Sequence, residues 1–314
     1  MPSQFSTRVC PACAGTAADC VLDLQAASFC SPNPTYSREY QVLLGVDEHT
    51  SFPVVRCNTC GFVYAQLEPD AGFLNTLYEK VIGSSHNAQA NEQRSGYALR
   101  MRYVADLVSL APLDGPNKAL DFGCGLGITL RMLNAAGVKA VGYDNSEVRR
   151  QYATDNAMRI AHAIEEVREL APFDIVVCDN VLEHLPDPRG TLRLLASLCA
   201  PAAVMYVSVP NGDGSFLGRQ GERLRNGGTV DMALNPWEHL NYFDLHHLDR
   251  MLDEAGFSAI PATELAFVDI GLRSESNLIT RLKNSLASTL RMARYAATGT
   301  ALRNPTYGFY RLRA

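Results

Sequence analysis

The sequence predicts an α/β protein, in which a small N-terminal module precedes a large domain built on a parallel sheet. Three observations lead to this fold class: two C-x-x-C pairs within residues 1–70, an alternation of strand and helix signals from Lys118 onward, and a glycine-rich turn after the first of those strands. Strand–helix alternation is typical of parallel sheets, whose strands are joined by crossover helices. A chain of 314 residues is long enough for one large domain and an accessory module.

The composition is that of an ordinary globular protein, with 47% hydrophobic and 19% charged residues. The formal net charge of -5 argues against nucleic acid as the main partner, because phosphate binding requires a basic face. The N-terminal stretch lacks the apolar core of a signal peptide, and no apolar run is long enough to span a bilayer. We therefore expect a cytoplasmic protein, whose 9 cysteines are metal ligands or packed thiols rather than disulfides.

The predicted N-terminal module, residues 1–70, carries two C-x-x-C knuckles. This spacing lets two thiolates face one ion, and Gly61, directly after the second knuckle, permits the tight turn that the geometry needs. Two knuckles complete a tetrahedral set of thiolates with no open position for catalysis, so we predict structural zinc. Cys20 and Cys30 have no matching spacing and are interpreted as packing thiols. The predicted zinc ligands are Cys10, Cys13, Cys57 and Cys60.

Residues 71–115 are predicted to form a helical linker or lid. A short helix is expected from Ala71, and apolar residues at helical spacing between Tyr97 and Leu110 predict a longer one. The polar stretch between them, GSSHNAQANEQR, could order over a bound ligand or be a plain linker. The predicted large domain then covers residues 116–314.

The glycine-rich turn of the large domain, LDFGCGLG, indicates the cofactor. A dinucleotide fingerprint, G-x-G-x-x-G, would need its third glycine where Ile128 stands. Three alternating glycines instead suit a ligand that lies flat on the turn, while the helix N-terminus behind them favours a carboxylate. Asp144 ends the next strand, where an acid can accept hydrogen bonds from both ribose hydroxyls, and Ser146 is placed to cap the helix that follows. An amino acid joined to a nucleoside fits this arrangement, so we predict S-adenosylmethionine.

The segments LDFGCGLG, VGYD and FDIVVCDNVLEHLPDP resemble the first three signature segments of class I S-adenosylmethionine-dependent methyltransferases. The stretch RCNTCGFVYAQLEPD resembles the zinc-binding N-terminal domain of a bacterial subset, which includes C-methyltransferases acting on nucleotide-linked deoxysugars. The resemblance implies a Rossmann-like sheet of seven strands, whose last strand, YGFYRLRA, is antiparallel. It also implies that the cofactor lies across the carboxyl ends of the first, second and fourth strands.

The resemblance also assigns cofactor-binding roles to individual residues. The residues that would contact the methionine part are Asp121, Gly123 and Gly125, in the turn that Gly127 completes. Those that would lie along the nucleoside and below the sulfonium are Asp144 at the ribose with Asn145 beside it, Ala163 and Ile164 at the adenine, and Asp179 and Asn180 at the sulfonium.

The candidate acceptor site is a glycine-rich insertion at about residues 211–243, after the fifth predicted strand. Long insertions above such a sheet usually belong to the substrate site. The insertion ends in NPWEHLNYFD, whose Glu238 and His239 resemble the Glu-His pair of the sugar C-methyltransferases, in which the histidine is assigned to proton transfer. The alternative is that His239 caps local backbone while Trp237 and Phe243 fill a corner.

His184, in LEHLPDP, is a further candidate base. The resemblance implies that this histidine lies close to the cofactor face, where such a residue is more often structural or positional. An amino-methyltransferase acting on bases or amides would carry an Asn/Asp-Pro-Pro-aromatic turn after the fourth strand. This chain has CDNVLEHL there instead, which argues against that class.

The leading hypothesis is methyl transfer from S-adenosylmethionine to a sugar-like or anionic small molecule, nucleotide-linked acceptors included, in a biosynthetic pathway. One alternative is an rRNA methyltransferase that docks through its zinc module, and another is a non-catalytic S-adenosylmethionine-binding protein. The stretch from Ile279 to the end is basic, with no acidic residue. A helix there could cover the sheet edge, pack a dimer or contact an anionic membrane surface.

Overall fold

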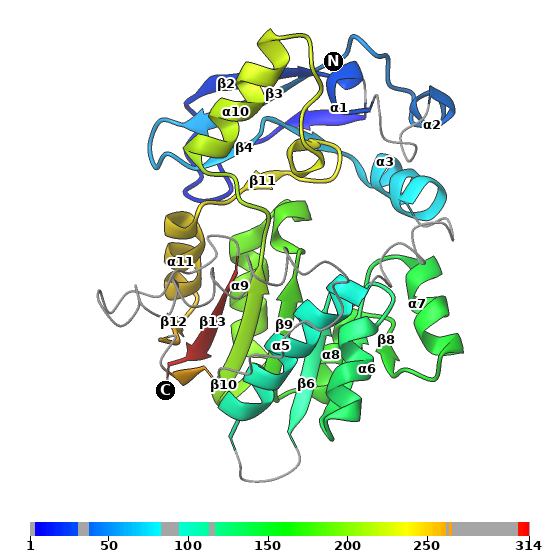
Figure 1. The fold of residues 1–314 in the computed structure, drawn as a ribbon, viewed down its shortest axis with the longest axis vertical. Helices are drawn as coiled ribbons and strands as arrows, with labels where there is room; N and C mark the ends of the chain where they lie inside the picture. The colour runs from blue at the N-terminus through cyan, green and yellow to red at the C-terminus, as the bar shows by residue number, and fades with distance from the viewer. Residues whose placement is uncertain are drawn as a thin grey trace, which may run out of the picture.

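The computed structural model describes residues 4–30, 38–82, 94–112, 117–261, 264–265 and 307–313. Figure 1 shows the N-terminal module at one end of the molecule and the large domain at the other. The predicted basic helix after Ile279 and residues 83–93 of the polar stretch lie outside the described residues. Across the described ranges, no helix is both long enough and apolar enough to traverse a bilayer.

A seven-stranded sheet forms the centre of the large domain, in the order β12-β13-β10-β9-β6-β7-β8. The five strands from β10 to β8 pair in parallel, whereas β13 is antiparallel to both of its neighbours. The predicted seven-stranded sheet with an antiparallel last strand is therefore confirmed. The strands are β6 (Lys118–Phe122), β7 (Lys139–Tyr143), β8 (Ile160–Ala161), β9 (Phe173–Asp179), β10 (Cys199–Ser208), β12 (Phe257–Ala259) and β13 (Tyr307–Leu312).

Helices cover both faces of this sheet, because successive strand residues point to opposite sides and both sides are apolar. On one face Leu120 and Val176 belong to a buried cluster with α8, α9 and α11. On the other face Ala119 and Val177 belong to a cluster with α5, α6 and α7. The helices are α5 (Arg94–Leu110), α6 (Ile128–Ala135), α7 (Glu147–Asp155), α8 (Ile164–Leu170), α9 (Pro188–Ser197) and α11 (Leu245–Glu254).

Side-chain caps fix where several of these helices begin. The predicted cap at Ser146 is confirmed, since its hydroxyl accepts a hydrogen bond from Arg149 N. Asp187 caps α9 with a proline at the first helical position, which separates α9 from the short helix η3 (Leu182–His184). Asp244 caps α11, and its side chain accepts a hydrogen bond from His247 N.

The N-terminal module is built on two antiparallel sheets. Strand β1 (Phe5–Thr7) pairs with β5 (Leu67–Pro69), and a four-stranded sheet has the order β11-β4-β3-β2. Short helices α1 and α2 lie between the two knuckles, and helices α3 and η2 follow β5. The remaining elements are β2 (Ala18–Gln25), α1 (Ala26–Cys30), α2 (Arg38–Leu43), β3 (Ser51–Cys57), β4 (Val63–Ala65), α3 (Ala71–Thr76) and η2 (Leu77–Ile82).

The insertion after β10 packs into the N-terminal module. It forms helix α10 (Gly214–Arg225), a short helix η4 (Met232–Leu234) and strand β11 (Asn241–Tyr242), which pairs with β4. Figure 1 shows α10 lying along β2 and β3. Trp237 is fully buried, and its ring contacts those of Phe29, Phe52 and Phe73 at centroid distances of 5.0, 6.1 and 5.9 Å. The insertion is thus part of the module's core rather than a loop above the sheet.

One prediction about the cysteines is wrong. Cys20, interpreted as a packing thiol, is exposed on β2. Plain alternation would place Cys20 on the same face as the buried Leu24, but the register of β2 against β3 shifts between Cys20 and Leu22, so Cys20 does not share that buried face.

Candidate functional site

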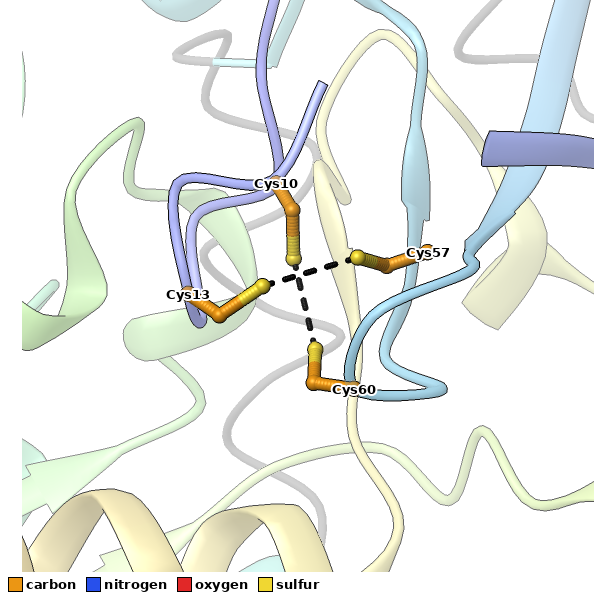
Figure 2. Close-up of side chains that lie close together, drawn as sticks. All are labelled: Cys10, Cys13, Cys57 and Cys60. Carbon is orange, nitrogen blue, oxygen red and sulfur yellow. Dashed lines mark hydrogen bonds between the residues drawn. The ribbon is translucent and has the colours of Figure 1, made fainter. Parts of the chain in front are cut away.

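Four cysteine thiols of the N-terminal module converge on one point (Figure 2). Cys10 Sγ lies 3.6 Å from Cys60 Sγ, and Cys13 Sγ lies 3.5 Å from Cys57 Sγ. All four sulfur atoms lie within 4.8 Å of one another. A tetrahedral zinc ion with Zn–S bonds of about 2.3 Å holds its sulfurs about 3.8 Å apart, so these donors fit zinc. Gly61 has a φ of 81°, which allows the tight turn predicted after the second knuckle.

The three glycines of the predicted cofactor turn all adopt left-handed backbone, with φ of 75° at Gly123, 54° at Gly125 and 73° at Gly127. An added Cβ would lie 2.4 Å from a Val181 methyl at Gly123 and 2.4 Å from Met158 Sδ at Gly127. At Gly125 it would meet no atom within 4 Å. Packing therefore requires the outer two glycines, whereas the middle one leaves its backbone open to a ligand.

Asp144 is buried at the carboxyl end of β7 and is bonded to the glycine turn. Its Oδ2 accepts a hydrogen bond from Gly125 N at 2.9 Å, and its Oδ1 accepts one from Ser146 N at 2.9 Å. A carboxylate offers about four lone-pair positions, so capacity remains for ribose hydroxyls. Asn145 follows directly, and Ala163 and Ile164 begin α8 after the neighbouring strand β8. The four predicted nucleoside-binding residues thus share one edge of the sheet.

The glycine turn is surrounded by acidic groups. Asp121 is 3% exposed, and its Oδ2 has no hydrogen-bond partner. Burial and the nearby Asp179 carboxylate raise the pKa of Asp121 to about 7. Asn180, with a φ of 55°, donates from Nδ2 to Asp179 Oδ1 at 3.0 Å. A cationic ligand would reduce the repulsion between these carboxylates. S-adenosylmethionine carries two cationic groups, an ammonium and a sulfonium, so the residues fit the predicted cofactor.

Two residues of α5 reach the same acids and were not predicted. Arg100 Nε lies 3.9 Å from Asp179 Oδ2, and the Tyr103 hydroxyl donates to that oxygen at 3.1 Å. Arg100 also offers a cation to a ligand carboxylate. Helical periodicity predicts the helix, but it does not show which of its polar side chains faces the sheet edge.

A second group of titratable side chains, the acceptor cluster, gathers around His184. Its Nδ1 lies 2.8 Å from Glu238 O and 3.3 Å from the Tyr78 hydroxyl, and its ring centroid lies 4.7 Å from that of His239. His239 Nδ1 lies 2.9 Å from Ala233 O. Because backbone carbonyls only accept, both imidazoles carry their proton on Nδ1 and keep a lone pair on Nε2. The acceptor cluster comprises the side chains of Tyr78, Glu183, His184 and His239 together with Glu238, whose backbone carbonyl reaches His184 while its carboxylate accepts from Asn235 Nδ2.

Desolvation keeps both imidazoles of the acceptor cluster uncharged near neutral pH. Burial and the adjacent His239 lower the pKa of His184 to about 3, and burial lowers the pKa of His239. Burial raises the pKa of Glu238 to about 7. Glu183 is 1% exposed with neither carboxyl oxygen hydrogen-bonded, and burial raises its pKa well above the usual range. A neutral imidazole with an available lone pair is the form that can take up a proton.

The acceptor cluster also contains a possible donor set for a cation. One carboxylate oxygen of Glu183 and one ring nitrogen each from His184 and His239 lie within 4.8 Å of one another. Imidazole and carboxylate are ligand types that divalent transition metals accept. Sequence reasoning missed Glu183 and Tyr78, because nothing in the local pattern shows that a buried acid or a linker tyrosine lies beside His184.

Apart from the four cysteines and Tyr78, the site residues fall within a range that matches a known family. Residues 92–262, more than half of the chain, match the family model described as a methyltransferase domain. The chain therefore belongs to this family. Its fold and its family identify it as a class I S-adenosylmethionine-dependent methyltransferase domain.

Individual proteins are similar over parts of the chain. The ubiquinone biosynthesis O-methyltransferase of Marinobacter nauticus is 32% identical over 124 residues, which cover 36% of this chain and 50% of that protein. The enzyme of the same name from Escherichia coli is 31% identical over 203 residues, covering 62% of this chain and 76% of that protein. The chain thus spans about half the length of the first of these curated relatives. A magnesium protoporphyrin IX methyltransferase structure from Synechocystis PCC 6803 with bound S-adenosylhomocysteine has a TM-score of 0.49 and 15% identity, covering 78% of this chain and 100% of that one.

Proposed function

We propose that this protein transfers the methyl group of S-adenosylmethionine to a small-molecule acceptor that is sugar-like or anionic, nucleotide-linked acceptors included. The observation that carries the proposal is the closeness of the two clusters. Tyr78 lies 3.3 Å from His184, and the Arg149 guanidinium stacks over the Tyr78 ring at 5.8 Å while lying 3.7 Å from Asp144. An acceptor held at His184 would therefore lie near a donor held at Asp144.

The protein must align the methyl donor with the acceptor and remove one proton from the acceptor. Methyl transfer is an in-line displacement, so the acceptor atom forms a bond to the methyl carbon as the sulfur–carbon bond breaks, leaving S-adenosylhomocysteine. Where the acceptor is a hydroxyl or an acidic C–H, its proton must leave to a base. We assign that role to His239 Nε2: Ala233 O and the His184 ring hold the His239 imidazole, and the Glu238 carbonyl in turn holds His184. Neutral imidazole and phenol groups suit an acceptor that bears hydroxyls.

We further propose that the four-cysteine cluster holds structural zinc. Its thiols come from two turns that pack against the large domain: the rings of Phe62 and Phe243 lie 5.1 Å apart, and His247 Nε2 donates to Cys60 O at 3.0 Å. The ion would fix these turns and would take no part in methyl transfer, because four thiolates leave no open coordination position.

The test of the proposed function is transfer of a labelled methyl group from S-adenosylmethionine into a small-molecule extract of the native cell. We expect one labelled small-molecule fraction and no label in RNA. Thermal stabilisation by S-adenosylhomocysteine but not by NAD is expected in parallel. Label in rRNA would support the docking alternative, and binding without any transfer would support a non-catalytic role.

Asp144→Asn is expected to weaken S-adenosylhomocysteine binding by at least about tenfold. The amide keeps the shape but loses the charge and one acceptor oxygen, and a hydrogen bond to a charged group contributes about 1.5 to 3 kcal/mol. Isothermal titration calorimetry measures the change. The matched control is Asp155→Asn, an exposed position on α7, which should bind as the parent does. Equal affinities for the two variants would contradict the ribose assignment.

A further inference from the structure

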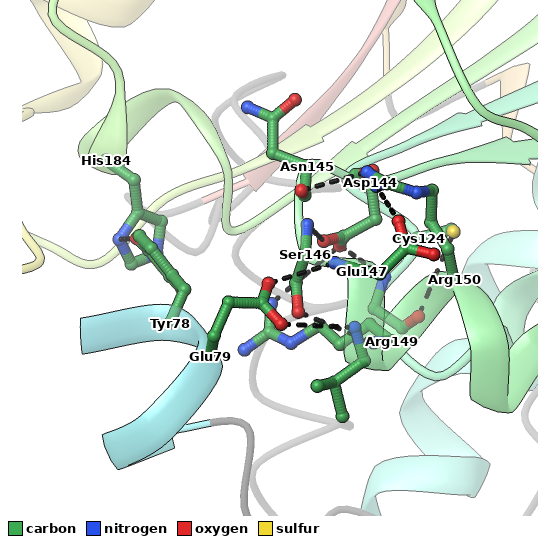
Figure 3. A network of polar contacts seen from close by, with 12 residues as sticks. Tyr78, Glu79, Cys124, Asp144, Asn145, Ser146, Glu147, Arg149, Arg150 and His184 are labelled. Carbon is green, nitrogen blue, oxygen red and sulfur yellow. Dashed lines mark hydrogen bonds and ion pairs between the residues drawn. The ribbon is translucent and has the colours of Figure 1, made fainter. Parts of the chain in front are cut away.

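The segment Leu77–Ile82 (η2) lies between the predicted donor site and the acceptor cluster. It forms a π-helix, a rare geometry that is frequent at functional sites. Two successive side chains of η2 reach different elements: Tyr78 lies against His184, and Glu79 extends to α7 (Figure 3).

Glu79 binds the N-terminus of α7 with both carboxylate oxygens. Oε1 accepts a hydrogen bond from Glu147 N at 2.9 Å, and Oε2 accepts one from Val148 N at 3.3 Å. The first N–H groups of a helix have no partner within the helix, and a negative charge there is also favoured by the helix dipole. Glu79, in the linker after the N-terminal module, therefore supplies the hydrogen-bond acceptors and the negative charge that the start of α7 lacks.

The same helix end contacts the predicted ribose-binding residue. Ser146 N donates to Asp144 Oδ1 at 2.9 Å, and Arg149 lies 3.7 Å from Asp144 Oδ2. Arg149 also lies over the Tyr78 ring. Figure 3 shows this chain of contacts running from Asp144 through the start of α7 to Glu79 and Tyr78. One carboxylate thus joins the element that faces the donor to the element that faces the acceptor.

We propose that Glu79 is a positioning residue that couples donor binding to the acceptor cluster. By fixing η2 on the start of α7, it holds Tyr78 against His184 and keeps Arg149 between Tyr78 and Asp144. The inference rests on the proposed function, because it takes Asp144 as the residue that binds the donor's ribose. Glu79 itself touches neither the reacting atoms nor, in this proposal, the substrates.

The test uses the full chain and S-adenosylhomocysteine as the probe. Glu79→Ala is expected to raise the Kd about fivefold, since a charge and two hydrogen bonds at an exposed helix end are lost. In the parent, binding of the probe is expected to slow amide hydrogen exchange in residues 77–82. In Glu79→Ala this slowing should be absent. Glu79→Gln keeps one acceptor oxygen, so its Kd should lie between those of the parent and of Glu79→Ala. Asp155→Asn removes a charge from the far end of α7 without touching η2 and should behave as the parent does.

The outcomes separate this inference from the function it rests on. If the parent does not bind the probe, the proposed function and the coupling both fail. If the parent binds and Glu79→Ala binds equally well with unchanged exchange in residues 77–82, the coupling alone is overturned. A variant that unfolds at a lower temperature but keeps its affinity and its exchange response would assign Glu79 a purely structural role, which also overturns the coupling.

Discussion

Cys57→Ser is expected to abolish the proposed zinc binding and to destabilise the whole N-terminal module. Zinc binding by four thiolates contributes about 10 to 16 kcal/mol in small zinc modules, and that energy is largely folding energy. Cys57 ends β3, the strand between β2 and β4, so loss of the ion would loosen the sheet that also contains β11. Metal content by emission spectroscopy should fall from about one zinc per chain, and the unfolding midpoint should fall with it.

Cys20→Ser provides a matched control, because Cys20 lies on β2 of the same sheet but is exposed and outside the cluster. It should keep the metal content and the unfolding midpoint of the parent. Loss of the metal should also reduce methyl transfer, because β11, a strand of the module's sheet, begins two residues after His239. A Cys57→Ser protein with full zinc content and an unchanged midpoint would contradict the proposed ligand set.

The features that follow from local pattern could be predicted from the sequence. The glycine turn, the acid at the end of the second strand and the cap at Ser146 depend on residues close together in the chain, and the structure has them where the pattern indicates. The alternation of strands and helices likewise predicts that the strands from β6 to β10 pair in parallel, because crossover helices connect them. These are short-range consequences of backbone geometry and periodicity.

The acceptor cluster depends on contacts that no local pattern reveals. Tyr78 and His184 are 106 residues apart, and β11 pairs with β4 although it is only two residues long. Such pairings are selected by the packing of the complete chain, in particular by the burial of Trp237 among the module's phenylalanines. The sequence predicts an insertion above the sheet, yet its apolar residues, such as Leu217, bury one side of helix α10 against the module.

The stretch NPWEHLNYFD combines the two interpretations that the sequence left open. Trp237 and Phe243 are fully buried, and His239 Nδ1 is engaged with Ala233 O, as a structural corner requires. The same turn directs the His239 ring toward His184 and leaves its Nε2 lone pair available. The packing of the corner therefore orients the imidazole, and only a functional measurement separates a proton acceptor from a residue that fills space.

His239→Ala is expected to lower the initial rate of labelled-methyl transfer by about 10² to 10⁴-fold, the usual contribution of a general base. Binding of S-adenosylhomocysteine should stay unchanged, because the contacts made by the donor-site residues do not include His239. The parent's rate should also depend on pH in a specific direction. Burial lowers the pKa of His239, so the neutral, proton-accepting form persists below the ordinary histidine range, and the acid limb of kcat/KM should lie below pH 6.5.

His246→Ala is the matched control, since His246 is an exposed histidine at the start of α11. It should transfer methyl at the parent rate. The metal contents of the parent and of His239→Ala distinguish a base from a metal ligand, because His239, His184 and Glu183 could also share a cation. A metal ion beyond that of the four-cysteine cluster, present in the parent and absent from His239→Ala, would assign His239 to a metal site. A His239→Ala protein as fast as the parent would show that the acceptor loses its proton without this imidazole.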